Sequence, residues 1–129
     1  MQVYQDQFYI VDVDPSNDQL SFIWKKGHPE VDHERFVAAC CNFIGYGFEY
    51  RSDKILIDTL NFDYTPTPEF YAWQKTKHHD RYRKLGIQRV AYVLHEEYVA
   101  QMNNMPQDES SFVTRYFANT TSAEAWLNQ

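Results

Sequence analysis

Two short and nearly continuous apolar runs constrain the fold of this chain more than any other feature. They read KILID at residues 54–58 and RVAYVL at residues 89–94. Strands that are buried on both faces have this composition and are typical of the centre of a parallel sheet. Between the runs, a helical pattern begins at Thr67 and Pro68 and ends before Gly86, as the capping preferences of these residues predict. A crossover helix joins parallel neighbours, so we expect the two runs to lie side by side in one sheet.

The residues before the first run predict an antiparallel hairpin and then a helix. QFYIVDVDP and QLSFIWKK alternate apolar and polar residues on either side of the turn PSND, which is typical of paired strands. Asp32 can cap the helix that follows, and the apolar stripe of this helix includes Phe36 and Phe43. We expect Gly45 and Gly47 to end it.

The residues after the second run continue the alternation of strands and helices. EEYVAQMNN is weakly helical, SFVTRYFA alternates as an edge strand does, and Thr121 and Glu124 have the spacing of a capping box. The predicted fold class is therefore α/β: a single-layer mixed β-sheet of about five strands, with an opening antiparallel hairpin and central parallel strands, packed with helices. With 129 residues and 43% hydrophobic composition, the chain suits one domain that spans residues 1–129.

Three local patterns, together with this order of elements, resemble the SpoIIAA-like branch of the STAS fold, which is often described as STAS/SEC14-like. The first is ILIDTLNFDYT, a buried strand that ends in Asp-Thr and runs into the proline-started PTPEFYAWQ. The second is GIQRVAYVLHEEYVAQM, and the third is FVTRYFANTTSAEAWLN, where an aromatic strand meets a capped helix. The resemblance spans nearly the whole chain and implies a SpoIIAA-like fold in a small bacterial protein.

The resemblance implies a role but little chemistry. Members of the wider fold are mostly regulatory or binding modules, which implies a non-catalytic module here. In anti-sigma-factor antagonists of this fold, the turn after the third strand carries a phosphorylatable serine in an Asp-Ser-Ser-Gly context. The corresponding turn reads Asp58-Thr59-Leu60-Asn61, with a hydroxyl but no glycine, so the phosphorylation switch is not carried over. The SEC14-like comparison makes an apolar pocket one interpretation of the 17% aromatic content. A self-association surface, or tyrosine rings that pack while their hydroxyls reach solvent, are the alternatives.

Polar residues follow both apolar runs, where the carboxyl ends of parallel strands meet and ligands tend to bind. The candidate ligand-binding residues are Asp58, Thr59, Asn61, Tyr64, His95 and Glu96. One interpretation is a small cytoplasmic, hydrolase-like enzyme that uses Asp58, His95 and Glu96 for proton transfer. The other is that Asp58 and Asn61 fix the turn through backbone hydrogen bonds. We favour the second, because the sequence has no nucleophile elbow, phosphate loop or dinucleotide fingerprint.

The helical pattern between the two runs carries much of the positive charge. Residues 74–89 hold six Lys and Arg residues against Asp80 alone, a local charge of +5 in a chain of net charge −6. Because aromatic residues lie between these cations, the candidate partner- or anion-binding residues are Trp73, Lys77, His78, Arg81 and Tyr82. The open interpretations are a solvated face that complements the helix dipole, an acidic protein partner or second copy in a homodimer, and an anionic lipid or small molecule. The acidic chain and the absence of a nucleic-acid-binding motif disfavour nucleic acid.

Several other classes are disfavoured. No stretch approaches the ~18 apolar residues that span a bilayer, and the start MQVYQDQFYIVDVDP lacks the regions of an export signal. We therefore expect a cytoplasmic location and no membrane insertion. The histidine spacings do not suit a helical metal pair, and the adjacent Cys40 and Cys41 resemble small buried hydrophobes, so we expect no metal and no cofactor. The preferred function is a non-catalytic binding or regulatory module for a protein partner or a small apolar or anionic ligand.

Overall fold

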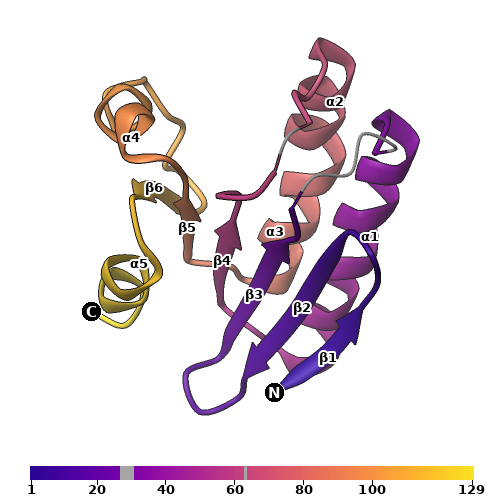
Figure 1. The fold of residues 1–129 in the computed structure, drawn as a ribbon. Helices are drawn as coiled ribbons and strands as arrows, with labels where there is room; N and C mark the ends of the chain where they lie inside the picture. Colours follow the sequence, from indigo (N-terminus) through magenta and orange to yellow (C-terminus); the bar gives the residue numbers. More distant parts are fainter. Residues whose placement is uncertain (27–30, 63) are drawn as a thin grey trace.

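The computed structural model describes residues 1–26, 31–62 and 64–129. Its centre is one mixed sheet of six strands in the order β1-β2-β3-β4-β5-β6 (Figure 1). The strands are β1 (Gln2–Gln5), β2 (Tyr9–Asp14), β3 (Gln19–Trp24), β4 (Lys54–Asp58), β5 (Arg89–Val93) and β6 (Val113–Phe117). The first three are antiparallel neighbours, and β3 to β6 are parallel.

The two central strands lie where the apolar runs predict them. β4 and β5 pair in parallel, with Ile55 opposite Val90 and Ile57 opposite Tyr92. Ile55, Leu56 and Ile57 of β4 are all buried. Because successive side chains of a strand point to opposite faces, both faces of the sheet are covered here. The predicted α/β class, with an opening antiparallel hairpin and central parallel strands, is confirmed.

The prediction of about five strands is wrong by one, because the structure adds the edge strand β1. In this short strand, only Val3 and Tyr4 are half-buried and both ends are exposed. Its register with β2 also shifts, since Gln2 pairs with Asp12 but Tyr4 pairs with Val11. An edge strand pairs on one side only and needs no long apolar pattern, so four mostly polar residues gave too weak a signal.

The described helices are α1 (His33–Tyr50), α2 (Pro68–Trp73), η1 (Gln74–His78), α3 (His79–Leu85), α4 (Glu96–Asn103) and α5 (Thr120–Leu127), of which η1 is a π-helix. The predicted caps are confirmed at two helices. The Asp32 side chain accepts a hydrogen bond from the amide of Arg35, and the Thr67 side chain accepts one from the amide of Phe70. One continuous helix was predicted from Thr67 to about Leu85; it has the predicted ends but contains the π-helical turn.

Two predicted helix boundaries are wrong. Helix α1 continues through both glycines to Tyr50 and closes at Arg51, which has a left-handed φ of 54°. Gly47 serves packing instead: a Cβ atom there would lie 2.9 Å from the Leu85 side chain, so a larger residue would force that side chain of α3 to shift.

The cap of the last helix also differs from the prediction. Helix α5 begins two residues earlier than the proposed capping box predicts, since its cap is Asn119 rather than Thr121. The Asn119 side chain accepts a hydrogen bond from the amide of Ser122 at 2.8 Å. Asparagine is as good a cap as threonine, so the local sequence offered two starting points.

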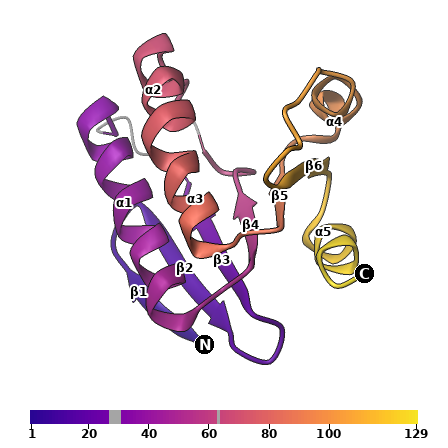
Figure 2. The ribbon, with the colours of Figure 1, turned by 180° about the vertical axis from the view of Figure 1, so that it is seen from behind.

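Helices cover both faces of the sheet. Helix α1 and the consecutive α2, η1 and α3 lie side by side over one face, and α5 lies over the other (Figure 1 and Figure 2). The α5 face holds a small cluster made by Leu56, Ala91, Val93, Ala123 and Leu127. Helix α4 packs against β6. Within the described part of the chain, no helix has the length and hydropathy that a membrane span requires.

Candidate functional site

A cavity of about 600 Å³ lies at the carboxyl ends of the parallel strands, and we name it the strand-end cavity. Trp24, Ile57, Tyr92 and Tyr116 line it from the ends of β3, β4, β5 and β6. The helical run α2–η1–α3 forms one wall, and α4 forms another; Figure 1 shows α2 and α4 at the same end of the sheet. Parallel α/β sheets place ligands at this edge, and the volume is typical of small-molecule sites.

Aromatic rings form much of the lining of the strand-end cavity. The Phe36 ring lies 4.2 Å from Phe70 and 5.4 Å from Tyr64, measured between ring centroids. Tyr92 and Tyr116 form a second group, with centroids 5.3 Å apart and planes inclined by 21°. Because these rings pack on each other, their orientations are fixed, and a ligand meets a preformed aromatic surface.

The π-helix η1 determines which side chains of the helical wall reach the cavity. Phe70, Gln74, His78 and Tyr82 all line it, at successive intervals of four residues. In a regular α-helix each such interval advances by about 400°, so Tyr82 would be rotated by about 120° from Phe70. In η1, the His79 amide donates to the Gln74 carbonyl five residues earlier, and this wider turn offsets the drift. The four side chains therefore stay aligned along one wall.

His78 lies in this wall as a neutral imidazole. Its side chain is 2% exposed, and its ring stacks on Trp73 at a centroid distance of 5.2 Å. Burial, with smaller contributions from His79 and Arg81, lowers the pKa of His78 to about 3. Its Nδ1 atom has no hydrogen-bond partner among the described residues. At neutral pH one ring nitrogen is therefore a donor and the other an acceptor.

Tyr82 carries a second unpaired polar atom next to His78. It is 1% exposed, and its ring centroid lies 4.7 Å from that of His78. Within the described part of the chain, its hydroxyl has no hydrogen-bond partner, and burial raises the pKa of this phenol well above its usual value. An unpaired buried polar group costs about 1–3 kcal/mol, and native proteins contain few of them. Both residues line the strand-end cavity, and Tyr82 also lines an adjoining cavity of about 260 Å³, so the two unpaired atoms lie in a wall that borders open space.

The lining of the strand-end cavity carries no Lys, Arg, Asp or Glu among its described residues. Its other polar side chains include Thr59, Gln74, His95 and Gln101. The Thr59 hydroxyl is already used, because it donates to the Val93 carbonyl at 2.9 Å. An ionised ligand group would therefore be buried without an opposite charge, which is costly.

Three of the six candidate ligand-binding residues line the strand-end cavity: Thr59, Tyr64 and His95. Asp58 does not line it. In the alternating pattern of β4, Asp58 follows Leu56 on the α5 face, and its carboxylate accepts a hydrogen bond from the Leu60 amide at 3.0 Å. The structure thus shows Asp58 and Thr59 fixing the turn after β4.

Asn61 and Glu96 lie outside the lining of the cavity. Asn61 is exposed in the turn after β4, and Glu96 is exposed in the first turn of α4. Among the described residues, no hydrogen bond or ion pair joins Asp58, His95 and Glu96. The structure shows no contact that would make these three side chains one acid–base group.

Three of the candidate partner-binding residues lie away from the strand-end cavity. Lys77 is exposed on η1. Arg81 is half-buried, and its guanidinium donates to the Cys41 sulfur at 3.0 Å, which ties α3 to α1. Trp73 is half-buried and packs on His78. The exposed basic surface is therefore narrower than the sequence suggested.

Sequence reasoning missed several residues that form the strand-end cavity. Tyr92 lies inside a run that reads as core, Tyr98 belongs to a weak helical pattern, and Tyr116 belongs to a strand expected near an edge. One signal could have found the site: Trp24, Tyr92 and Tyr116 each stand within the last two residues of a parallel strand. This repeated placement puts aromatic rings at one edge of the sheet.

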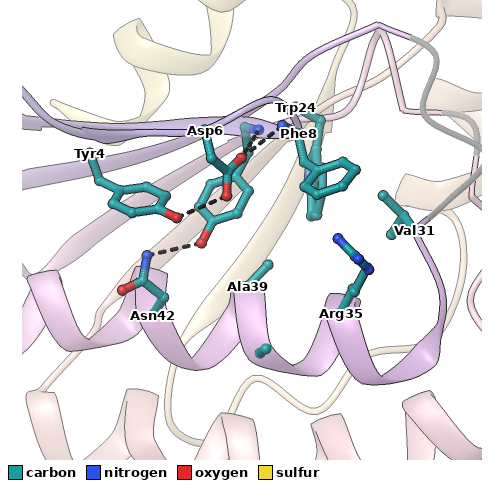
Figure 3. Close-up of a pocket in the computed structure, with 10 residues that line it drawn as sticks. Tyr4, Asp6, Phe8, Trp24, Val31, Arg35, Ala39 and Asn42 are labelled. Atoms are coloured by element: carbon teal, nitrogen blue, oxygen red, sulfur yellow. Dashed lines mark hydrogen bonds between the residues drawn. The ribbon is translucent and has the colours of Figure 1, made fainter.

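A second cavity, of about 270 Å³, lies between the opening strands and α1, and we name it the hairpin cavity (Figure 3). Four of its polar side chains, Tyr4, Asp6, Tyr9 and Asn42, are hydrogen-bonded, and the Arg35 guanidinium lies 5.2 Å from the centroid of the Phe8 ring. The Tyr4 hydroxyl donates to Asp6 at 2.8 Å, and the Asn42 amide donates to the Tyr9 hydroxyl at 2.9 Å. Asp6 also accepts from two backbone amides at 2.7 and 3.1 Å. These polar groups are explained by local structure.

The described residues contain no group of three or more His, Cys, Asp or Glu side chains that could hold a metal ion. No protein-family model, curated protein or solved structure matches this chain. Function is therefore inferred from the strand-end cavity itself.

Proposed function

We propose that this protein is a non-catalytic binding module that takes a small, mainly apolar ligand into the strand-end cavity. The observation that carries the proposal is the cavity itself, with about 600 Å³ of space and an aromatic lining at the carboxyl ends of the parallel strands. Concave sites with a mostly apolar lining and a few polar groups are the usual form of small-molecule sites. Three residues expected at a ligand site, Thr59, Tyr64 and His95, line this one.

Binding is favoured over catalysis because the polar residues near β4 have structural partners. The Thr59 hydroxyl donates to Val93, and the Asp58 carboxylate accepts from Leu60. A general acid or base must come within about 3 Å of its substrate, directly or through one water. Asp58 follows Leu56 on the α5 face and is absent from the described lining of the cavity, which disfavours it as an acid or base for a ligand bound there.

A regulatory role is consistent with the same proposal. The resemblance to SpoIIAA-like STAS domains supports such a role in the cytoplasm, in which the module would bind a protein partner or a second copy of the chain. The turn η1 supplies His78 to the cavity and exposes Lys75 and Lys77 on the surface. A change of η1 on ligand binding would therefore move two cations that an acidic partner could recognise.

Fluorescence of N-phenylnaphthylamine, a neutral probe that brightens in apolar sites, tests the proposal. We expect saturable brightening with the unmodified protein. Gln101 is exposed on α4 and lines the cavity, so Gln101→Trp should fill part of the space and weaken binding about tenfold, or about 1.4 kcal/mol.

Glu97→Trp is the matched control, because Glu97 is exposed on the same helix and lies outside the described lining. This variant should bind the probe as the unmodified protein does. Circular dichroism should show the same helix content in both variants. Absence of brightening, or equal weakening by both substitutions, would show that the strand-end cavity is not a ligand site.

A further inference from the structure

Resting on the proposed function, we propose that the ligand of the strand-end cavity is a neutral aromatic molecule whose hydroxyl or carbonyl group hydrogen-bonds to Tyr82 and His78. These two residues would then determine specificity. Three properties of the described lining support this class of ligand: its lack of charge, its paired rings, and its two unpaired polar atoms.

The lack of charge disfavours ionised ligands on energetic grounds. No Lys, Arg, Asp or Glu is among the described lining residues, and burial keeps His78 neutral by lowering its pKa to about 3. A carboxylate or phosphate would lose its hydration without gaining a cation. Aromatic rings can attract an ammonium group, but the described lining has no carboxylate to balance its charge.

The paired rings favour a flat ligand. Phe36 and Phe70 lie 4.2 Å apart with planes inclined by 21°, and Tyr92 and Tyr116 lie 5.3 Å apart at the same inclination. All four line the cavity. A planar arene can meet such rings in offset-stacked or edge-to-face contact, and each such contact adds to simple area burial.

The two unpaired atoms favour a polar group on that arene. The Tyr82 hydroxyl can donate and accept, and the neutral His78 ring has one donor and one acceptor nitrogen. The Tyr82 hydroxyl and His78 Nδ1 are buried without partners among the described residues, on side chains whose rings lie 4.7 Å apart. A ligand hydroxyl could donate to one and accept from the other, and a carbonyl could accept from Tyr82. Pairing these atoms removes the penalty of leaving them unpaired.

Displacement of N-phenylnaphthylamine by naphthol, naphthalene and naphthoate tests the inference at neutral pH. The three compounds share one ring system and differ in a neutral hydroxyl, no polar group, and a carboxylate. We expect naphthol to compete best, naphthalene about tenfold less well, since a net hydrogen bond is worth about one such factor, and naphthoate least. In Tyr82→Phe, naphthol should lose its advantage over naphthalene, while N-phenylnaphthylamine should still bind.

Tyr98→Phe is the matched control, because Tyr98 also lines the cavity but is 50% exposed. It should keep the preference for naphthol. Competition by naphthoate equal to that by naphthol, or an unchanged naphthol preference in Tyr82→Phe, would overturn the inference while leaving the proposed function intact. A protein that binds none of the probes would overturn both.

Discussion

The hairpin cavity and the strand-end cavity differ in how their polar groups are used. In the hairpin cavity, Tyr4, Asp6 and Tyr9 are connected by hydrogen bonds. In the strand-end cavity, Tyr82 and His78 each keep a buried atom that has no partner among the described residues. Both are concave spaces, so space alone does not mark a ligand site. The combination of space with unpaired polar groups does.

Trp24 allows the two cavities to be compared directly, because it lines both. Its ring centroid lies 4.4 Å from Phe62, which lines the strand-end cavity, and 5.4 Å from Tyr9, which lines the hairpin cavity. At 3% exposure it is part of the core. The indole therefore separates the two cavities, and aromatic rings pack against it on both sides.

Trp24→Ala should have the largest effect on stability. Removal of a buried indole costs about 3–5 kcal/mol, and here it would also join the two cavities. Urea unfolding followed by far-ultraviolet circular dichroism measures the loss. Trp126→Ala is the matched control. Trp126 is half-buried on the α5 face, with the Arg89 guanidinium 5.1 Å from its ring centroid. Its substitution should lower the free energy of unfolding by less than that of Trp24. Equal decreases in the free energy of unfolding for the two variants would contradict the packing of Trp24 between the two cavities.

Acidification should destabilise the strand-end wall through His78. Its pKa of about 3 in the folded chain lies below the ordinary histidine value of 6.5, so the unfolded chain binds a proton first as the pH falls. Protonation of His78 therefore leaves the free energy of unfolding unchanged above about pH 6.5. Between that value and about pH 3, it lowers the free energy of unfolding progressively. From pH 7.5 to pH 5, His78 should lower the free energy of unfolding by about 2 kcal/mol.

The measurement is urea unfolding across that pH range in the unmodified protein and in His78→Gln. His79, whose pKa burial lowers to about 4, acts in the same direction in both proteins, so their difference reports mainly on His78. His95→Gln, at an exposed position, controls for the loss of an imidazole. The same pH dependence in His78→Gln and the unmodified protein would contradict the buried, neutral state of His78.

The sequence predicts the fold where one local cause dominates. Burial on both faces makes KILID and RVAYVL continuous, and the caps at Asp32 and Thr67 are local hydrogen bonds. It does not predict β1, whose pairing depends on β2 rather than on its own pattern. It also places the end of α1 too early, because the packing of Gly47 against Leu85 is a tertiary contact.

The candidate site is predictable only in part, for a similar reason. The edge of the sheet is predictable, and with it Thr59 and His95, because parallel strands end together. The sequence groups Asp58 with Thr59, but alternation along β4 places Asp58 on the α5 face with Leu56, whereas Thr59, just after the strand, lines the cavity. The place of His78 could not be predicted, since it depends on the π-helical turn, and the basic residues around it suggested a solvated surface instead.

The smallest predicted effect on stability comes from removing one tyrosine hydroxyl in each cavity, and it gives the most direct comparison of the two. Tyr9→Phe removes the hydroxyl that accepts from the Asn42 amide at 2.9 Å, so it should lower the free energy of unfolding by about 1 kcal/mol. Tyr82→Phe removes a hydroxyl that has no described partner, so stability should stay unchanged or rise by up to about 1 kcal/mol.

Both substitutions remove one oxygen from a buried tyrosine, with exposures of 4% for Tyr9 and 1% for Tyr82, so changes in area and volume nearly cancel in the comparison. Urea unfolding without added ligand gives both values under the same conditions. Opposite or clearly unequal changes would show that the hairpin cavity is satisfied by its own residues and the strand-end cavity is not. Equal losses would mean that the Tyr82 hydroxyl already has a partner in the folded protein, such as a bound water, and the distinction between the two cavities would then disappear.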